Sequence, residues 1–508
     1  MVKKDAGTFR IRETHEERIH HFVKRMLLVL LVLAVLVLPT SSCAPADSGS
    51  ENPGTLYTAE TVPHTSETRP TPESAADSNE GPVTSGKDAA DSVEERGTEA
   101  VTSGEEGPVP TAEVTTPTEI RKVFSVTDSP EVFSVGEDIY DLDCTAFLFQ
   151  ETVATSFSRF LLDMQERGFV LYATNGDNGI GGLCRQATLY NALFTVNITR
   201  YAKTKETYIT VEARRDLSPL QIKPETAYEG TNTVFHNPKH PTVNEKYKFG
   251  ELDIFQLTNK HFVVVDGAQE YSSRMFVEYL ENIAGEGNVP VIDAWFFTHA
   301  HPDHIYCCWG VGRDADLVGR IRVNGFYYTF PNDKGVRTEK DYEGLVEQIA
   351  NLNSVLGNFR TAEGTVTPKY KIHGGMVFYI NEIRAEVLMT QDQLMPEEYK
   401  SFNDSSTSFR FTVYSAENVQ TTFLIMGDAN TPVCDKIMEK YDYNTLHTNF
   451  FTSLHHGSND CPTFFQFIAP DYLIYTAPSK KTSTGYQWLN VNCKAYFTAP
   501  SVIPIPYS

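Results

Sequence analysis

The sequence predicts an α/β protein whose C-terminal half is a layered sandwich of mixed β-strands with covering α-helices. Three observations lead to this prediction. Residues 229–508 alternate strand and helix patterns, residues 121–228 have the pattern of a small α+β set, and residues 44–120 lack the apolar side chains that a core needs. We therefore divide the 508 residues into an N-terminal segment (1–43), a linker (44–120), a small domain (121–228) and a large domain (229–508).

The N-terminal segment has the pattern of an export signal. Thirteen uncharged apolar residues (26–38) follow Lys24 and Arg25. At about 1.5 Å per residue they are too short to cross a hydrocarbon core of about 30 Å, and the small residues after them suit cleavage. Cys43 resembles the lipid-attachment cysteine of bacterial lipoproteins, although Thr40 stands where these usually have Leu. We expect a lipid anchor at Cys43 and a location outside the bacterial cytoplasmic membrane; simple secretion and an uncleaved anchor are the alternatives.

The linker over 44–120 is rich in Ser, Thr, Pro, Glu and Gly. It has sixteen acidic and three basic side chains and one aromatic, Tyr57. Such a segment buries too little apolar surface to offset the entropy of ordering. The composition predicts a disordered, self-repelling tether between an anchor and a folded region.

The overall charge excludes one class of partner. The chain has 66 acidic against 43 basic side chains, a formal net charge of −23. A protein that binds long nucleic acids needs a basic surface for the phosphates, so we do not expect that function.

The small domain is predicted from alternating and helical apolar patterns. It contains no histidine and no acidic cluster with catalytic spacing, so its role stays unassigned. Its predicted elements are strands over 144–150, 169–173, 193–198 and 207–211 and a helix over 156–167.

The large domain alternates strands and helices more regularly. A hairpin turns at Asn259-Lys260, and Ser272 begins a helix with one apolar face. The other predicted elements are strands over 251–257, 261–265, 291–297, 384–389, 408–413, 422–426 and 449–454, a helix over 339–356 and a helix after Pro432.

The strand that ends at Phe297 runs into a cluster of metal-binding residue types. His299, His301, Asp303 and His304 lie within six residues of one another. Imidazole nitrogens and carboxylate oxygens are suitable zinc ligands. Alternation in an extended segment directs His299 and His301 toward one ion, while Asp303 and His304 at the turn into a helix can serve a second.

This H-x-H-x-D-H string resembles the signature of the metallo-β-lactamase superfamily of hydrolases. The resemblance covers about 229–508 and implies the αββα sandwich of that family. Three other segments, one before the motif and two after it, also resemble the family in their order along the chain and in their position at strand ends. They are Val263–Gly267, whose Asp266 would orient a metal-binding histidine, Phe423–Asp428, whose Asp428 would bridge two ions, and Leu454–Ser458, where His455 or His456 would supply the last ligand.

Within the superfamily one branch is most similar. The His-His-Gly-Ser ending, the stretch over Asn403–Ser408 and the segment over Ala469–Tyr475 resemble the branch that includes the metallo-hydrolase domain of the competence DNA-uptake channel. No membrane bundle accompanies them here, which excludes the full channel protein.

The chain departs from the family at one ligand. His373 is the only histidine between His304 and Asp428, and before a turn we interpret it as structural rather than as a ligand. The pair of Cys307 and Cys308 follows the motif on the next helix, where we expect both thiols to point into the core.

The resemblance implies a hydrolase with zinc, with two ions at full occupancy; a single ion or another divalent ion is the alternative. A metal-activated hydroxide would attack a phosphorus or carbonyl carbon. Asp303 would bind an ion and orient this nucleophile, and the histidine of the 455–456 pair that binds no metal would protonate the leaving group. The candidate metal ligands are thus His299, His301, Asp303, His304, Asp428, His455 and His456, and the candidate catalytic residues are Asp303, His455 and His456.

The resemblance favours phosphate esters or diesters, either small molecules or cell-envelope polymers, as substrates of an enzyme tethered to the membrane. Two alternatives stay open. One is a lactone or lactam hydrolase of the same superfamily. The other is a surface-binding lipoprotein that keeps the fold with a weakened metal site.

Overall fold

The computed structural model describes residues 116–124, 131–137, 143–176, 179–225, 230–240, 250–331, 342–393, 401–416, 419–458, 461–476 and 493–507. The predicted export signal with Cys43, and the predicted linker up to residue 115, lie outside these ranges. No helix within the described ranges has both the length and the apolar character of a membrane span.

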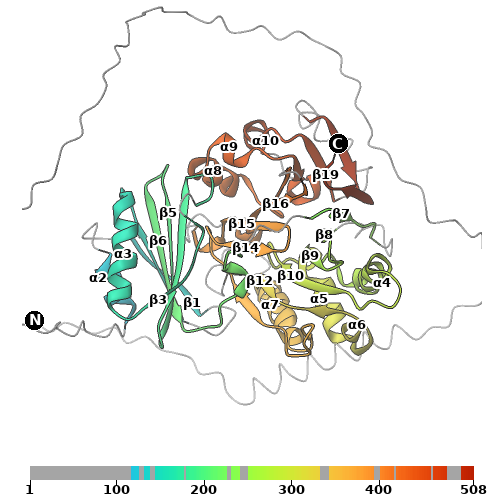
Figure 1. Ribbon diagram of the computed structural model, residues 1–508, viewed down its shortest axis with the longest axis horizontal. Coiled ribbons are helices and arrows are strands. Elements are labelled where there is room, and N and C mark those ends of the chain that lie inside the picture. Colours follow the sequence, from blue (N-terminus) through green and yellow to red (C-terminus); the bar gives the residue numbers. More distant parts are fainter. Residues whose placement is uncertain are drawn as a thin grey trace, which may run out of the picture. The chain divides into compact units, whose positions relative to one another are not determined.

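Two large sheets form the centre of the C-terminal region (Figure 1). In the first the order is β13-β12-β10-β9-β8-β7-β21, with β11 also beside β10. Its strands are β7 (Val234–Asn237), β8 (Leu252–Gln256), β9 (Phe262–Asp266), β10 (Val291–Phe296), β11 (Arg322–Val323), β12 (Phe326–Tyr328), β13 (Lys369–Lys371) and β21 (Ser501–Pro504).

The second sheet has the order β14-β15-β16-β17-β18-β19-β20. Its strands are β14 (Val377–Ile380), β15 (Ile383–Met389), β16 (Ser408–Tyr414), β17 (Gln420–Ile425), β18 (Phe450–Thr452), β19 (Tyr472–Tyr475) and β20 (Ala495–Thr498). The helices of the C-terminal region are α4 (Ser273–Ala284), α5 (Pro302–Arg313), α6 (Ala315–Gly319), α7 (Tyr342–Leu356), α8 (Thr431–Lys440), α9 (Tyr443–Leu446) and α10 (Pro462–Ile468).

An aromatic core joins the two sheets face to face. Phe296 of the first sheet packs on Phe411 of the second, with ring centroids 5.7 Å apart. Phe255 packs in the same way on Phe423, at 5.0 Å. The alternation of β-strand side chains directs the intervening residues, such as Trp295, to the opposite face of the first sheet.

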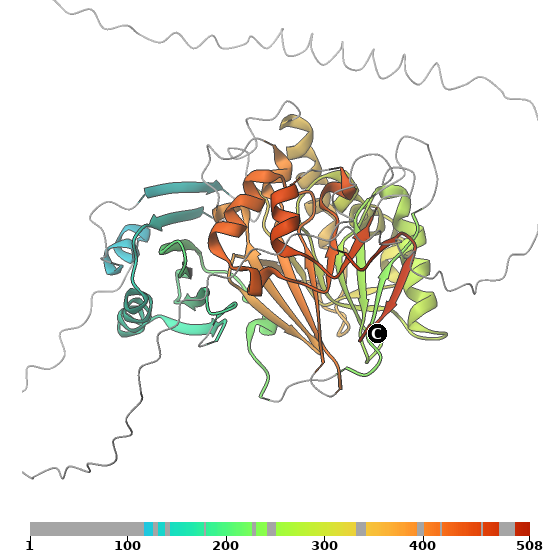
Figure 2. The ribbon, with the colours of Figure 1, turned by 90° about the horizontal axis from the view of Figure 1, so that it is seen from above.

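Helices cover the outer face of each sheet. Phe276 of α4 packs on Trp295 of the first sheet, and α5 and α7 belong to the same core. Val433 of α8 and Phe464 of α10 share a core with Phe451 of the second sheet. Figure 2 shows the strands between α4 on one side and the orange and red helices on the other. The predicted αββα sandwich is confirmed by this sheet order and by the cores of its layers.

A third, antiparallel sheet precedes the sandwich in sequence, with the order β1-β2-β6-β5-β4-β3. The helix and the strands predicted for the small domain are confirmed, while β1 and β4 were not predicted. The elements are α2 (Pro117–Val123), β1 (Glu131–Glu137), β2 (Asp143–Phe149), α3 (Ala154–Glu166), β3 (Val170–Thr174), β4 (Cys184–Tyr190), β5 (Phe194–Tyr201) and β6 (Glu206–Ala213).

The start of α2 differs from the prediction of a disordered linker up to residue 120. Thr116 accepts a hydrogen bond from the Glu119 backbone and Glu119 caps the Thr116 backbone in return, with Pro117 at the first helical position. Ile120 is fully buried against α3 and the third sheet. Local capping and one apolar anchor therefore order the last residues of the predicted linker.

Both faces of the third sheet are covered. One face packs on α2 and α3 around Phe157 and Ile198. Tyr201 and Tyr208, on the other face, belong to the core that covers the outside of the second large sheet. The hydroxyl of Tyr201 donates to the Leu388 carbonyl at 3.1 Å. The third sheet thus shares its packing with the sandwich.

The ends of parallel strands gather the predicted site residues at one edge of the sandwich. β9 runs parallel to β10, and β17, β18 and β19 run parallel to one another. Asp266 ends β9, Thr298 follows β10, Asp428 follows β17 and His455 follows β18. The carboxyl ends of parallel strands are where α/β sheets place their ligands.

Candidate metal centre

The first group of candidate ligands consists of His299, His301 and Asp428, with ligand atoms within 4.8 Å of one another. His299 Nε2 lies 3.0 Å from His301 Nδ1. Two imidazole nitrogens on one zinc, each at about 2.0–2.1 Å, stand about 3.4 Å apart in tetrahedral geometry. Burial lowers the pKa of both histidines, so their rings are neutral and offer lone pairs to an ion.

The second group consists of Asp303, His304 and His456, also within 4.8 Å of one another. His456 Nε2 is 3.3 Å from Asp303 Oδ2. Burial by itself would raise the pKa of Asp303, but the hydrogen bond from His456 and the charge of His304 bring this pKa down to about 2. Asp303 is therefore an ionised carboxylate, the form that binds a cation.

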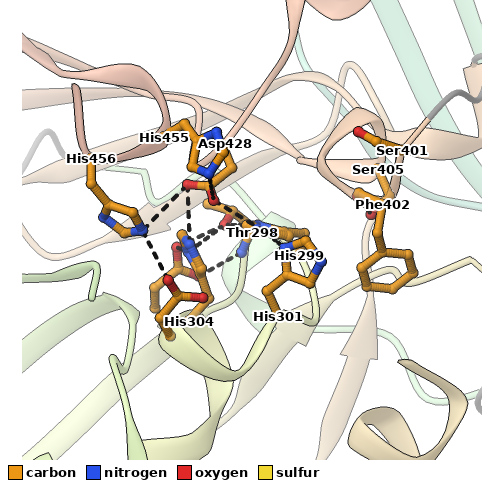
Figure 3. Close-up of polar contacts among 12 residues, drawn as sticks. Thr298, His299, His301, His304, Ser401, Phe402, Ser405, Asp428, His455 and His456 are labelled. Carbon is orange, nitrogen blue, oxygen red and sulfur yellow. Dashed lines mark hydrogen bonds and ion pairs between the residues drawn. The ribbon is translucent and has the colours of Figure 1, made fainter. Parts of the chain in front are cut away.

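Asp428 lies between the two groups, as Figure 3 shows. Its Oδ1 is 3.1 Å from His304 Nε2 and 3.6 Å from His456 Nε2. Its Oδ2 is 3.7 Å from His299 Nε2 and 3.5 Å from His455 Nε2. Burial opposes ionisation, but the charge of His304 holds the pKa of Asp428 well below its usual range. One oxygen thus faces each group, as the predicted bridging role requires.

Asp266 fixes the orientation of the His304 ring through a hydrogen bond. Its carboxylate accepts hydrogen bonds from the backbone and the hydroxyl of Thr298 and from His304 Nδ1, all at 2.7 Å. Because Nδ1 faces Asp266, Nε2 of His304 is directed to the centre. The structure places Asp266 where the sequence predicts it.

The carboxylates of the centre favour positive charge on His304. Burial opposes protonation of His304, but Asp428 and then Asp266 raise its pKa well above the usual value. In other words, the surrounding carboxylates stabilise a proton at the position where they would stabilise a metal cation. Imidazoles and carboxylates converging on one carboxylate are a donor set that fits zinc or another divalent ion.

The two histidines of the 455–456 pair point in different directions. Both have left-handed backbone conformations, with φ of 50° and 53°. His456 Nδ1 is held 3.0 Å from the Thr476 hydroxyl, which directs Nε2 to the second group. The structure therefore places His456, and not His455, in the second group of candidate ligands.

His455 lies on the other side of Asp428, and 40 % of its side chain is exposed. Burial lowers its pKa, so the ring is neutral at pH 7. The acid role of the histidine that binds no metal stays a prediction. From this position His455 could also donate an N–H hydrogen bond to a substrate oxygen or ligate an ion of the first group.

Two features of the centre were not predicted from the sequence. Phe402, in a short 3₁₀ segment (Phe402–Ser405), packs on the His301 ring with centroids 5.4 Å apart (Figure 3). Glu251 is fully buried, with an oxygen within 4.8 Å of ligand atoms of Asp428 and His456. The sequence does contain a signal for Glu251, because Glu251 and Asp253 are two acidic residues on one face of an otherwise apolar predicted strand.

His373 lies in another buried network. Its Nδ1 contacts Asp392 at 2.5 Å, and its Nε2 is 3.0 Å from Glu212 of the third sheet. Burial opposes protonation, but Glu212 and then Asp392 raise the pKa of His373. It is in none of the candidate metal groups found among the described residues.

The cysteines also lie apart from the metal groups. Cys307 and Cys308 are fully buried in the core under the first sheet, as predicted. No disulfide joins any of the seven cysteines that the structure describes.

No family model matches the chain, and no curated protein is similar to it in sequence. Among solved structures, zinc-bound PqqB from Methylobacterium extorquens matches 53 % of this chain and 99 % of its own, with 8 % identity and a TM-score of 0.32. The metallo-β-lactamase MIM-1 from Novosphingobium pentaromativorans matches 49 % of this chain and 82 % of its own, with 12 % identity and a TM-score of 0.23. Both TM-scores are low, so the fold assignment rests on the sheet order and the cores described above.

Proposed function

We propose that the chain is a metal-dependent hydrolase with a two-ion centre. The observation that carries this proposal is the position of Asp428, whose two oxygens face two separate groups of imidazole and carboxylate ligands. Divalent ions held there would polarise the bond to be cleaved and lower the pKa of water. The alternative of a weakened metal site rests on the interpretation of His373, the only histidine between His304 and Asp428, as structural. The first group already includes Asp428, and His455, whose Nε2 lies 3.5 Å from Asp428 Oδ2, could provide a further ligand there.

We expect the residues around the centre to have three roles: metal binding, orientation of the attacking water and substrate binding. His299, His301, His304 and His456 would hold the ions, and Asp428 would fix the spacing between them. Asp303, with a pKa of about 2, stays ionised and can accept a hydrogen bond that orients the attacking water. His455, half exposed, is placed to hydrogen-bond a substrate oxygen.

The substrate we propose is a phosphate ester or diester. A transferring phosphorus group carries charge on several oxygens, and two adjacent cations stabilise both the attacking and the leaving oxygen. The similarity of the His-His-Gly-Ser ending to the competence branch also favours phosphate diesters. Lactone or lactam hydrolysis is the competing reaction.

Metal removal tests the reaction. The purified chain should contain about two divalent ions, hydrolyse bis-p-nitrophenyl phosphate, lose this activity on chelation and regain it with zinc. Metal content by mass spectrometry and turnover are measured together, with a lactone and nitrocefin as parallel substrates. A chain with no bound metal would overturn the hydrolase proposal. Metal-dependent turnover of the lactone or nitrocefin alone would overturn the choice of phosphate.

We further propose that the enzyme works in the cell envelope, attached through lipid on Cys43, on a small molecule or an envelope polymer. The support is the short apolar segment before small residues and the acidic linker after them. Mass spectrometry of the mature protein should find Cys43 as a lipid-modified first residue. An unmodified Cys43, or a different first residue, would contradict the anchor.

A further inference from the structure

Glu251 reaches the metal centre from a strand that carries none of the predicted ligands. It directly precedes β8, which pairs antiparallel with β9 so that Leu252 lies opposite Asp266. Glu251 therefore stands at the same sheet edge as Asp266. Glu251 is fully buried.

The backbone of Glu251 is fixed on both sides. Its N–H donates to the Asp303 carbonyl at 3.0 Å, and its carbonyl accepts from the Ala268 N–H at 2.8 Å. The preceding Gly250 lies so close that an added Cβ would stand 2.9 Å from the Ala268 Cα and 3.0 Å from the Asp303 carbonyl oxygen. Close packing thus ties Glu251 to the segment that carries Asp303.

The side chain of Glu251 has no hydrogen-bond partner among the residues that the structure describes. Neither oxygen makes a hydrogen bond with any residue that the structure describes, and both are inaccessible to solvent. By contrast, the neighbouring Asp266 accepts three hydrogen bonds. A buried carboxylate without partners is costly unless a cation lies beside it.

The surroundings of Glu251 supply a place for that cation. One of its oxygens lies within 4.8 Å of ligand atoms of Asp428 and His456, and an oxygen also lies within 4.8 Å of those of Asp266 and His304. His304 and His456 belong to the second group. Glu251 therefore lies beside the second position and is absent from the first group.

We propose that Glu251 is a further carboxylate ligand of the ion held by Asp303, His304 and His456. This inference rests on the proposed metal centre. Asp303, Asp428 and Glu251 would then give the second position three carboxylates beside two imidazoles. The first position has two imidazoles and the shared Asp428. Because carboxylates favour harder ions such as Mn²⁺, the second position would accept Mn²⁺ more readily than the first.

The test is a titration of the metal-free full chain with Mn²⁺ and, separately, with Zn²⁺. In Glu251→Gln we expect the affinity for Mn²⁺ to fall at least about 10-fold, since even groups that only support a ligand cost about 10–100-fold in metal affinity. Free Mn²⁺ is measured by electron paramagnetic resonance and bound Zn²⁺ by mass spectrometry. Glu251→Met, which has similar volume and no oxygen, should lose more affinity than Glu251→Gln.

Asp253→Asn is the matched control. Asp253 is equally buried on the same strand but accepts a hydrogen bond from Asn237 at 3.1 Å and belongs to none of the metal groups among the described residues. Its metal affinities should equal those of the unchanged chain. Two ions bound by Glu251→Gln and by Glu251→Met with unchanged affinities would overturn the role of Glu251 alone. An unchanged chain that binds neither ion would overturn the proposed function together with it. Circular dichroism confirms that each variant is folded.

Discussion

Replacing His301 with alanine should remove one metal ion per chain and nearly all turnover. His301 Nδ1 stands 3.0 Å from His299 Nε2, and its loss leaves the first group with one imidazole and the shared Asp428. An ion contributes several kcal/mol of charge stabilisation in the transition state; about 4 kcal/mol corresponds to a fall in kcat/KM of about 10³-fold. Metal content and kcat/KM on the same preparation measure both effects.

His373→Ala is the control for this variant. His373 is buried between Glu212 and Asp392, apart from the candidate metal groups. Removing it leaves two buried carboxylates short of a counter-charge, so the free energy of unfolding should fall by about 3–5 kcal/mol. Metal content and turnover of the folded fraction should stay near those of the unchanged chain. If His373→Ala loses one ion, His373 is a ligand; if His301→Ala keeps full metal and activity, the hydrolase proposal fails.

Replacing Asp428 with alanine should have the larger effect, because both ions lose a ligand at once. Its Oδ1 faces His304 and its Oδ2 faces His299, so no single remaining side chain spans the two groups. Without this negative charge, the two cations would also repel each other more strongly. We expect fewer than one ion per chain and a fall in kcat/KM of about 10⁴-fold, equivalent to about 5–6 kcal/mol.

The variant Asp428→Asn tests the charge of Asp428 separately from the size of its side chain. The amide keeps one acceptor oxygen and the size of the side chain but loses the charge that neutralises the ions. It should bind metal more weakly than the unchanged chain and more strongly than Asp428→Ala. Zinc affinities by competition with a chelating dye rank the three proteins. Two tightly bound ions in Asp428→Ala would show that the bridging role is wrong.

The sequence predicted those parts of the centre whose information is local. His299, His301, Asp303 and His304 occupy one continuous segment, so their spacing alone indicated two groups of ligands. The αββα layers were predictable because strands such as β9 are apolar on both faces and the helices are apolar on one.

The choice within the 455–456 pair depends on backbone conformation and on a distant partner. Two successive left-handed residues turn the rings apart, and Thr476 at the end of β19 then fixes His456. Neither the backbone conformation nor the contact with Thr476 can be predicted from the His-His-Gly-Ser motif. Glu251 was missed for a related reason, since its neighbour Asp303 lies far along the chain and the two meet only through tertiary packing.

Strand β4 was missed because one of its two buried faces carries polar side chains, while Ala187 and Leu189 lie on the other. Gln186 and Thr188 are buried, Gln186 donates a hydrogen bond to Thr188, and Thr188 donates one to Asn197. A strand of this kind lacks the apolar alternation that predicts one from sequence. Its burial comes from coverage on both faces of the third sheet.

That double coverage means that the boundary near residue 229 does not separate two independent folding units. A protein cut at this point would leave Lys440, buried and paired with Glu206 at 2.7 Å, without its counter-ion. Tyr441 and Tyr201 both donate to the Leu388 carbonyl, so the same cut would uncover a large aromatic surface beside β15. The third sheet and the sandwich should therefore melt in one calorimetric transition, because the sandwich that carries the proposed metal centre shares part of its core with the third sheet.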